Sequence, residues 1–253
     1  MPGRPYVLAE TTWSSVRETH FQVAVLPWGA IEAHNLHLPY STDVIESEAI
    51  AAAAAGQAWE QGARVIVLPA IPYGVNTGQL DVDLDLNLNP STQMAILRDL
   101  ATVLEHQGIP KLVILNGHGG NDFKQMIREM WPEYDLFICQ LNWYNIGEDE
   151  MFVEKGDHAG EMETSLLQHL KPEWVLPVEQ AGSGQARRFR IRALREGWAW
   201  SQRDWSQVTT DTGVGDPHRA SPEKGREYFE RLTSKIAGFF VELAAADVDA
   251  LYA

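Results

Sequence analysis

Three short segments of the chain combine histidine and carboxylate side chains. The first holds Glu32, His34, His37 and Asp43, the second is Asn-Gly-His-Gly-Gly-Asn over residues 116–121, and the third begins with Asp157 and His158. Imidazole and carboxylate donors without cysteine suit a hard-to-borderline divalent metal, and a shared carboxylate allows two such metals to bind side by side. The residue types therefore predict a pair of divalent metals that share one carboxylate.

The first segment follows a run that reads as a buried strand over residues 21–26. In an extended segment, residues two apart point the same way, so Glu32 and His34 can face one pocket. Asp43 lies where the next helix is expected to begin, and its carboxylate can turn to a metal or cap the amides of that helix. A polar loop with a helix cap is the alternative. Four ligand-type residues within twelve positions favour the metal site.

The second segment places His118 in a glycine-rich turn after an apolar run at residues 111–115. Glycines let the backbone approach a ligand closely and adopt positive φ. The turn then opens a helix, whose free N–H groups could bind an oxyanion or phosphate, so a phosphate-binding turn is the alternative. His118 favours a metal site, because a phosphate loop needs no imidazole at that position.

The third segment precedes a helix expected over residues 161–170. Glu161 and Glu163 would point about 200° apart on this helix, so at most one of them can reach a pocket and the other pairs or caps locally. His158 precedes the first turn, a position suited to proton transfer, and Asp157 lies beside it in the sequence.

The elements that position these residues alternate along the chain. Apolar runs predict strands over residues 21–26, 64–68, 111–115 and 136–141, and helical patterns cover residues 41–61, 91–107, 123–130, 161–170 and 221–246. This alternation predicts a mainly parallel sheet with helices on both faces, a three-layer α/β/α fold in a single domain over residues 1–253. Ligands of such sheets bind outside the carboxyl ends of the strands, where the first two segments lie.

Composition narrows the function classes. The 253 residues are 45% hydrophobic and 22% charged, which is ordinary for a globular protein that buries a sizeable core. The formal net charge of -15 argues against nucleic acid or an anionic membrane as partner. Cys139 is the single cysteine and lies in an apolar run, so we expect a small core residue. No signal-like or membrane-spanning run is visible, and we expect a cytoplasmic protein.

The stretch over residues 180–215 fits the alternation least, and we expect a strand excursion or a lid there. Its arginines have roughly two-residue spacing at first, which is typical of one solvated strand face: Arg187, Arg188, Arg190, Arg192 and Arg195. Contact with an acidic neighbouring subunit and a phosphate-bearing substrate are the alternatives. Several tryptophans could wall a pocket or pack in the core or a subunit interface: Trp143, Trp198, Trp200 and Trp205.

Taken together, these segments resemble the signature sequences of the creatininase (creatinine amidohydrolase) family. The resemblance is carried by Leu-Pro-Trp-Gly-Ala-Ile-Glu-Ala-His at residues 26–34, His-Leu-Pro at 37–39 with Thr42-Asp43, Asn-Gly-His-Gly-Gly-Asn at 116–121, and His-Ala-Gly-Glu at 158–161 with Glu163-Thr164-Ser165. Tyr73-Gly74 and residues 213–217 followed by Ala220 fall in the expected order. The matching segments extend over most of the chain, and in combination they are specific.

The resemblance implies a flavodoxin-like fold, a homo-oligomer that is often a hexamer, and a two-metal amidohydrolase site. It implies that Glu32 and His118 bind one metal, that His34 binds the other, and that Asp43 bridges both. Creatininase completes the second site with a glutamate at the position where this chain has Gly120. Glu161 is the implied substitute. The ligand set suits Zn, Mn or Fe and does not choose among them.

The same resemblance implies a mechanism. A hydroxide held between two divalent ions attacks an amide carbonyl that one metal polarises. His158 delivers a proton to the leaving nitrogen, and Asp157 orients or assists it. His37 resembles a family histidine that supports a ligand carboxylate, with an ordinary loop histidine as the alternative. Three further residues are candidates for substrate-binding or supporting positions: Asn76, Gly119 and Trp143.

Departures from the family pattern widen the substrate class. Residues 75–81 lack the Phe-Pro-Gly sequence common in relatives, and His34-Asn35-Leu36-His37 replaces the usual His-Gly. We therefore expect a small cyclic amide or a formamide rather than creatinine alone. Two other function classes are left open by the residues: a non-catalytic protein that keeps the fold and one metal, and a nucleotide-binding protein that uses the turn at residues 117–120.

Overall fold

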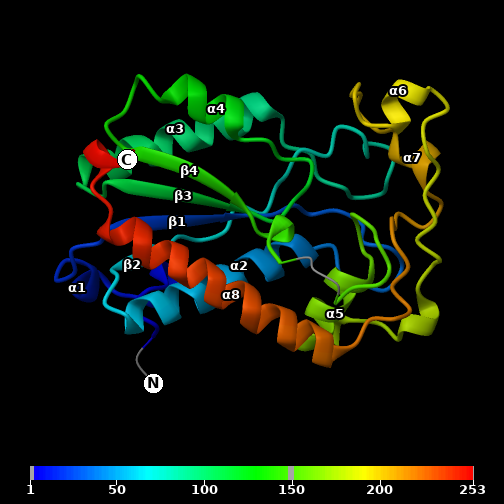
Figure 1. Cartoon of the computed structure of the whole chain (residues 1–253), viewed down its shortest axis with the longest axis horizontal. Coiled ribbons are helices and arrows are strands. Elements are labelled where there is room, and N and C mark those ends of the chain that lie inside the picture. Colours follow the sequence, from blue (N-terminus) through cyan, green and yellow to red (C-terminus); the bar gives the residue numbers. More distant parts are fainter. Residues whose placement is uncertain (1–2, 148–150, 253) are drawn as a thin grey trace.

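The structure, a computed structural model, describes residues 3–147 and 151–252. Its sheet contains the parallel strands β1 (Val23–Trp28), β2 (Val65–Val67), β3 (Lys111–Asn116) and β4 (Phe137–Asn142), in the order β2-β1-β3-β4 (Figure 1). This is the strand order of flavodoxin-like folds. Every residue of β1, β2 and β3 is buried, as the apolar runs predict for a sheet covered on both faces.

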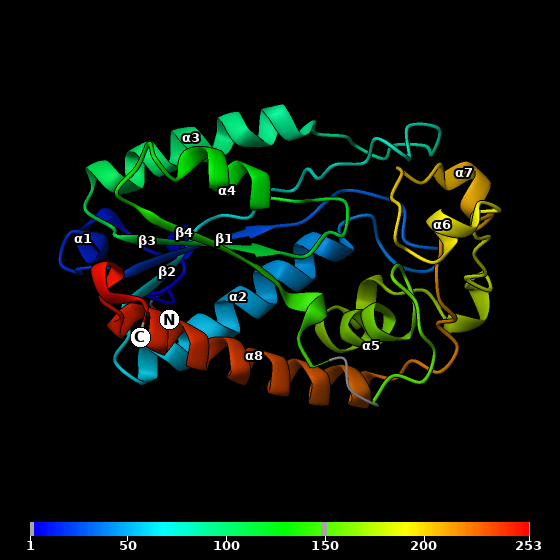
Figure 2. The ribbon, with the colours of Figure 1, turned by 45° about the horizontal axis from the view of Figure 1, so that its top comes forward.

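Helices cover the two faces of the sheet as separate layers (Figure 2). The helices α3 (Pro90–His106) and α4 (Lys124–Met130) lie on one face, and α2 (Thr42–Glu60) and α8 (Pro222–Ala245) lie on the other. The helix α5 (Glu161–Leu170) packs against α2 and α8. The three-layer α/β/α prediction is confirmed, and the predicted strands and helices end within about two residues of the observed ones.

The strand β1 shows how the sequence divides the core. Val23 and Val25 pack in the cluster with α2 and α8, whereas Ala24 and Leu26 pack in the cluster with α3 and α4. Side chains alternate across a strand, so a continuous apolar run supplies both cores at once. Cys139 on β4 is partly buried against the first cluster, as predicted, and burial raises the pKa of its thiol to about 12.

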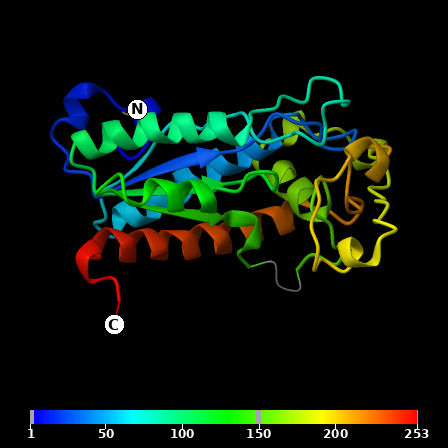
Figure 3. The same cartoon turned by 90° about the horizontal axis from the view of Figure 1, so that it is seen from above.

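Residues 180–215 form no strand in the part of the chain that the structure describes. They hold the short helices α6 (Arg192–Arg195) and α7 (Trp205–Val208) beyond the carboxyl ends of the strands (Figure 3). The strand prediction is therefore wrong for this stretch. The Asp211 carboxylate accepts hydrogen bonds from the backbone N–H of Gly184 (3.1 Å) and of Gly213 (3.1 Å). A side chain thus binds backbone groups that a neighbouring strand would bind in a sheet. The five arginines are exposed, but on irregular chain and on α6.

Short elements complete the chain: α1 (Trp13–Val16) and the 3-10 turns η1 (Leu8–Glu10), η2 (Trp143–Asn145), η3 (Pro172–Trp174), η4 (Val178–Gln180) and η5 (Val248–Ala250). Within the described residues, the helices are too short or too polar for any of them to cross a lipid bilayer. The single domain over residues 1–253 stays a prediction.

Lys111, the first residue of β3, closes the C-terminal end of α8. Its Nζ donates to the carbonyl oxygens of Leu243 (2.8 Å), Ala244 (3.2 Å) and Ala246 (2.6 Å). The last carbonyls of a helix have no partner within the helix, and the helix dipole favours a cation at this end. A nearly buried lysine thus joins the sheet to the longest helix.

Replacing Lys111 by methionine should lower the free energy of unfolding by about 2 kcal/mol, because buried carbonyls lose a charged donor while the apolar stem is retained. Urea denaturation followed by circular dichroism measures the change. Lys235→Met on the exposed side of α8 is the matched control, with an expected change within about 0.5 kcal/mol. Equal effects of the two substitutions would contradict the capping role.

Candidate metal centre

The topology brings the first two histidine- and carboxylate-bearing segments to one place. The order of the strands reverses between β1 and β3, and ligands of open α/β sheets bind at this switch point. Trp28 and Asn116 are paired at the carboxyl ends of these strands, and the N–H of Gly117 donates to the Trp28 carbonyl (2.9 Å). The chain after each strand therefore starts from the same edge.

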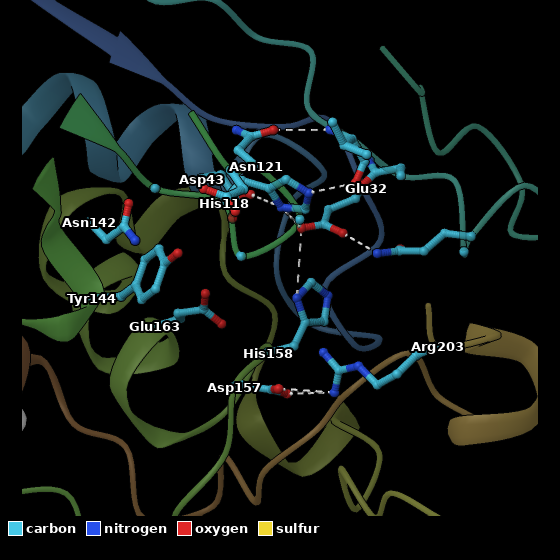
Figure 4. A pocket seen from close by; sticks show the side chains of 18 of the residues that line it. Glu32, Asp43, His118, Asn121, Asn142, Tyr144, Asp157, His158, Glu163 and Arg203 are labelled. Carbon is cyan, nitrogen blue, oxygen red and sulfur yellow. Dashed lines mark hydrogen bonds and ion pairs between the residues drawn. The ribbon is translucent and has the colours of Figure 1, made fainter. Parts of the chain in front are cut away.

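Four of the predicted ligands meet there. His118 Nδ1 lies 2.7 Å from Glu32 Oε1 and 3.0 Å from Asp43 Oδ2. His34 Nε2 lies 2.9 Å from Asp43 Oδ1. Each oxygen of Asp43 thus faces a different histidine (Figure 4 shows the side of His118). All four side chains are buried, at 5% exposure or less.

The potential ligand atoms form overlapping groups. Glu32, Asp43 and His118 form one group, and His34, Asp43 and Glu163 form another, with the ligand atoms of each group within 4.8 Å of one another. Asp43 belongs to both groups. A third group joins His158 to Glu32 and His34. This arrangement offers two adjacent cation positions with one carboxylate in common.

Unsatisfied atoms test whether a cation fits. His34 Nε2 and Asp43 Oδ2 are buried and form no hydrogen bond within the described chain, although each lies about 3 Å from an oppositely charged group. Buried polar atoms nearly always have a hydrogen-bond partner. Atoms that lie this close without hydrogen-bond geometry are suited to a common third partner, which a divalent cation would be.

The raised pKa values of His34 and His118 also indicate a site that favours positive charge. Burial alone would lower the pKa of His34, but the charge and hydrogen bond of Asp43, together with the charges of Glu163 and Glu32, outweigh burial and raise it to about 10. Burial opposes protonation of His118 too, and Glu32 with Asp43 raises its pKa well above the usual value. The carboxylates thus demand positive charge here. A divalent cation supplies that charge and uses the imidazole lone pairs that protons otherwise occupy.

Glu161, the predicted last ligand, is not among the residues brought together. Its Oε2 accepts from the backbone N–H of Val153 (2.9 Å) and Glu154 (2.8 Å), and its Oε1 pairs with Lys224 of α8. Glu163 faces His34 and Asp43 instead. Both glutamates line the cavity, contrary to the expectation that at most one of them reaches it, but only Glu163 joins a ligand group, while Glu161 is held by its contact with α8.

Gly120 leaves no room for a carboxylate at the position that creatininase uses. A Cβ atom there would lie 2.2 Å from the carbonyl oxygen of Val75 and 2.5 Å from His118 Nε2. His118 belongs to the same turn as Gly120, so the two groups compete for one space. With this backbone, the second carboxylate must come from another element, and α5 provides Glu163.

His158 lies against the same centre. Its ring centroid is 4.1 Å from that of His34, and its Nδ1 is 3.8 Å from Glu32 Oε1. Its Nε2 bonds to the carbonyl of Ala33 at 2.8 Å, and Trp205 meets the ring edge-on at 5.3 Å. Burial and the neighbouring His34 lower the pKa of His158, which favours the neutral ring.

Asp157 lies near His158 in sequence, but its carboxylate points elsewhere. Asp157 Oδ2 pairs with Arg203 Nη1 at 2.9 Å, at the exposed rim of the site (Figure 4). The partner of His158 Nε2 is a backbone carbonyl and not this carboxylate. The predicted orienting contact is therefore replaced by an ion pair with residues 180–215.

The remaining predicted residues are divided between the cavity and its support. His37 Nε2 bonds to Thr164 Oγ1 at 2.9 Å, next to Glu163 on α5. Asn76 lines the cavity, and its Nδ2 donates to the carbonyls of Ile31 (3.4 Å) and Leu86 (3.2 Å). Gly119 lines the cavity, with open space where a side chain would be. Trp143 is fully buried in the core and does not line the cavity.

The cavity has a volume of about 570 Å³. The metal-type groups form one wall, and Asn142 and Tyr144 lie opposite His158 (Figure 4). Residues 200–203 and Trp205 line the cavity from the outer side. The backbone N–H of Trp205 donates to the Gly78 carbonyl (2.8 Å), which holds this stretch in place. We call residues 180–215 the cover, because residues 200–203 and Trp205 of this stretch line the cavity; a lid function stays a prediction.

The sequence missed several residues of the centre. Gln79 Nε2 donates to Glu32 Oε2 at 2.6 Å, Asp85 Oδ1 accepts from the N–H of Ala33 at 2.6 Å, and Glu46 is fully buried beside Asp43 on α2. The helix start that contains Glu163 was a visible signal for that residue. Gln79 and Asp85 lie in a polar loop whose local pattern carries no comparable signal.

Glu46 is a buried acid of the centre whose carboxylate has no hydrogen-bond partner in the described chain. Burial raises its pKa well above the usual value, and the charges of Glu163 and Asp43 add to the shift. Burial therefore favours the protonated form of Glu46 in the folded protein.

Glu46→Gln should stabilise the metal-free protein at pH 8 and have little effect near pH 4.5. Above pH 4.5 the unfolded chain loses this proton while the folded chain keeps it, so wild-type stability falls by up to about 1.4 kcal/mol per pH unit. Glutamine has no such dependence. Thermal unfolding of chelator-treated protein at several pH values measures the difference. Exposed Glu48→Gln on the same helix is the control, and a pH-independent effect of Glu46→Gln would refute the buried proton.

Comparisons with known proteins place the chain in a family. The family model described as Creatininase: Creatinine amidohydrolase matches residues 9–240. A putative creatinine amidohydrolase from Bacteroides fragilis NCTC 9343 is 42% identical, with a TM-score of 0.92 over 98% of this chain and 99% of that chain. The mycofactocin precursor peptide peptidase of Mycobacterium ulcerans (strain Agy99) is 26% identical over 230 residues, which is 88% of this chain and 82% of that protein.

Two creatininase structures share the fold at lower identity. A mutant creatininase of the Zn-Zn type is 22% identical and creatininase Mn is 21% identical, each with a TM-score of 0.78 over 95% of this chain and 99% of that chain. These neighbours carry Zn or Mn. The match of the family model over most of the chain, with the histidine and carboxylate centre, shows that this chain belongs to the creatininase (creatinine amidohydrolase) family of metal-dependent amidohydrolases.

Proposed function

We propose that this chain is a two-metal amidohydrolase that cleaves the C–N bond of a small cyclic amide or a formamide. The observation that carries the proposal is the position of Asp43, whose two oxygens face His34 and His118 in separate ligand groups. Two divalent ions, with Zn, Mn and Fe as candidates, fit these groups. A non-catalytic protein with one metal would require only one of these ligand groups, and a nucleotide-binding protein would require neither.

The proposed ligands are divided between two positions. Glu32 and His118 hold one metal, His34 and Glu163 hold the other, and Asp43 bridges them. Glu163 thus takes the role first assigned to Glu161. When bound, the metals supply a polarised substrate carbonyl and a water of lowered pKa. Gln79 fixes the outer oxygen of Glu32, which leaves Oε1 free to face its metal.

His158 is the proposed proton carrier. A carbonyl oxygen can only accept, so the bond to Ala33 requires the proton of the neutral ring to be on Nε2. The lone pair is then on Nδ1, which faces Glu32 and the cavity. The ring can take a proton at Nδ1 and return it to the leaving nitrogen. Asp157 acts differently in this proposal: with Arg203 it holds the cover over the cavity.

Assembly and location belong to the same proposal. We expect a cytoplasmic homo-oligomer, and the family resemblance implies a hexamer. The exposed arginines of the cover, in a chain of net charge -15, favour contact with an acidic surface of a neighbouring copy.

A peptide amide is the second candidate substrate. The relative from M. ulcerans is named as a precursor peptide peptidase. A cavity of about 570 Å³ exceeds the space that a single small cyclic amide occupies. Short peptides therefore belong in the substrate panel beside creatinine, other cyclic amides and formamides.

Metal content tests the ligand assignment. Asp43→Ala should remove both metals, Glu163→Gln should leave about one per chain, and Glu161→Gln should retain two. Glutamine preserves the size of each side chain while weakening it as a ligand. Elemental analysis of dialysed protein, with circular dichroism as the folding control, gives the result. Two metals in Asp43→Ala, or a loss in Glu161→Gln alone, would refute the assignment.

His158→Ala should keep both metals and reduce kcat by about 10² to 10⁴, the usual contribution of a positioned acid–base group. The substrate panel is assayed by release of the product amine or acid, with metal content measured on the same samples. His20→Ala is the control, because His20 is exposed and precedes β1, at the end of the strand opposite to the metal centre. A full rate in His158→Ala would remove its role in proton transfer.

A further inference from the structure

Ala33 lies between the proposed ligands Glu32 and His34, and side chains from other segments bind both of its backbone groups. Its N–H donates to Asp85 Oδ1 at 2.6 Å, and its carbonyl accepts from His158 Nε2 at 2.8 Å. The neighbouring groups are bound more locally: the Glu32 N–H donates to the Tyr40 carbonyl, and the Glu32 carbonyl contacts His34 Nδ1. Asp85 and His158 are thus connected through one residue.

The loop that carries Asp85 runs beside the ligand segment. The Leu86 N–H donates to the Ile31 carbonyl at 3.0 Å, and Asn76 Nδ2 contacts the carbonyls of both Ile31 and Leu86. Two residues further along the ligand segment, the backbone N–H of Ala33 is met by the Asp85 carboxylate. The two segments are therefore joined by a backbone hydrogen bond at Ile31 and by a side-chain acceptor, Asp85, at Ala33.

The backbone is strained at this point. Leu84 has φ 61°, a left-handed conformation that costs roughly 1–2 kcal/mol for a residue with a side chain, and its own side chain is 79% exposed. The exposed leucine gains little from packing there. Local strain of this kind is often retained where it holds a functional group in place. Here the strained residue directly precedes Asp85.

We propose that Asp85 is a positioning residue that orients His158 through Ala33. The short bond from the Ala33 N–H to Asp85 holds the backbone of Ala33 in one orientation. The direction in which the Ala33 carbonyl points is thereby held as well. That carbonyl selects the Nε2–H tautomer of His158 and turns Nδ1 toward the cavity. A group that fixes the tautomer of a catalytic histidine has a large effect on rate without contacting the substrate. The inference rests on the role of His158 proposed above.

Two substitutions at one position separate this role from a general contribution to folding. Asp85→Asn retains an Oδ1 acceptor for the Ala33 N–H, whereas Asp85→Ala removes it. The exposed Asp83→Ala, two residues away in the same loop, is the matched control. Should Asp85→Ala unfold, Asp85→Leu fills a similar volume without an acceptor and takes its place.

The decisive readout is the tautomer of His158 in Zn-loaded protein with ¹⁵N-labelled histidine. Two-bond ¹⁵N–¹H spectra report which ring nitrogen carries the proton, and the His158 signals are assigned by their loss in His158→Ala. We expect Nε2–H in wild type, Asp85→Asn and Asp83→Ala, and a mixture of tautomers in Asp85→Ala. We also expect kcat to fall about 10- to 100-fold in Asp85→Ala and less than threefold in Asp85→Asn, with two metals retained.

Two results would overturn the proposal. One is an unchanged tautomer in Asp85→Ala. The other is a loss of metal from Asp85→Ala with the wild-type tautomer retained, because Asp85 would then act on the ligands rather than on His158. The tautomer is observed without turnover. An active His158→Ala would therefore refute the proposed role of His158, while the spectra would still decide whether Asp85 controls the ring.

Discussion

The arrangement of the whole centre depends on the burial of several carboxylates in one place. Glu32, Asp43, Glu46 and Glu163 are each 9% exposed or less, and no lysine or arginine pairs with them in the described chain. Unpaired charges at such depth are costly, so each acid must be protonated, hydrogen-bonded or neutralised. His34 and His118 neutralise part of this charge, and burial raises the pKa of Glu163 to about 7. A divalent cation bound by these groups would neutralise the remaining charge. Glu32, Asp43 and Glu163, whose charges are costly to bury unpaired, are also the carboxylates of the candidate metal-binding groups.

The sheet makes this concentration of charge possible. A parallel sheet covered on both faces has a large apolar core on either side, and its polar ends are the natural place for the loops. Close approach at the edge is needed as well. A Cβ atom on Gly117 would lie 2.1 Å from Ser47 Oγ and 2.6 Å from Trp143 Nε1. The glycine after β3 thus lets the start of α2, which carries Asp43, lie against the turn that carries His118.

Local rules were sufficient for part of the site. Glu32, His34, Asp43 and His118 follow two buried strands or begin the next helix, and the parallel topology then requires them to meet. The choice between Glu161 and Glu163 could not be made this way. It depends on the rotation of α5 about its axis, which is fixed by contacts such as that of Glu161 with Lys224, a residue 63 positions away. Asp85 and Gln79 were not identified for the same reason, because their partners lie about 50 positions earlier in the chain.

Residues 180–215 show a different limit of sequence reasoning. The spacing of their arginines suggested a strand, but in the described chain no strand of the sheet pairs with this stretch. Two of the side-chain contacts that hold this cover at the site differ in magnitude. The Arg203–Asp157 pair has side chains that are 39% and 56% exposed, so its net contribution is about 0–1 kcal/mol. Trp205 is 5% exposed, and burying an indole contributes about 4 kcal/mol by its area alone. The indole therefore contributes more than the ion pair to holding the cover. Because Trp205 also meets the His158 ring edge-on, the element that closes the cavity is in direct contact with the ring proposed to carry the proton.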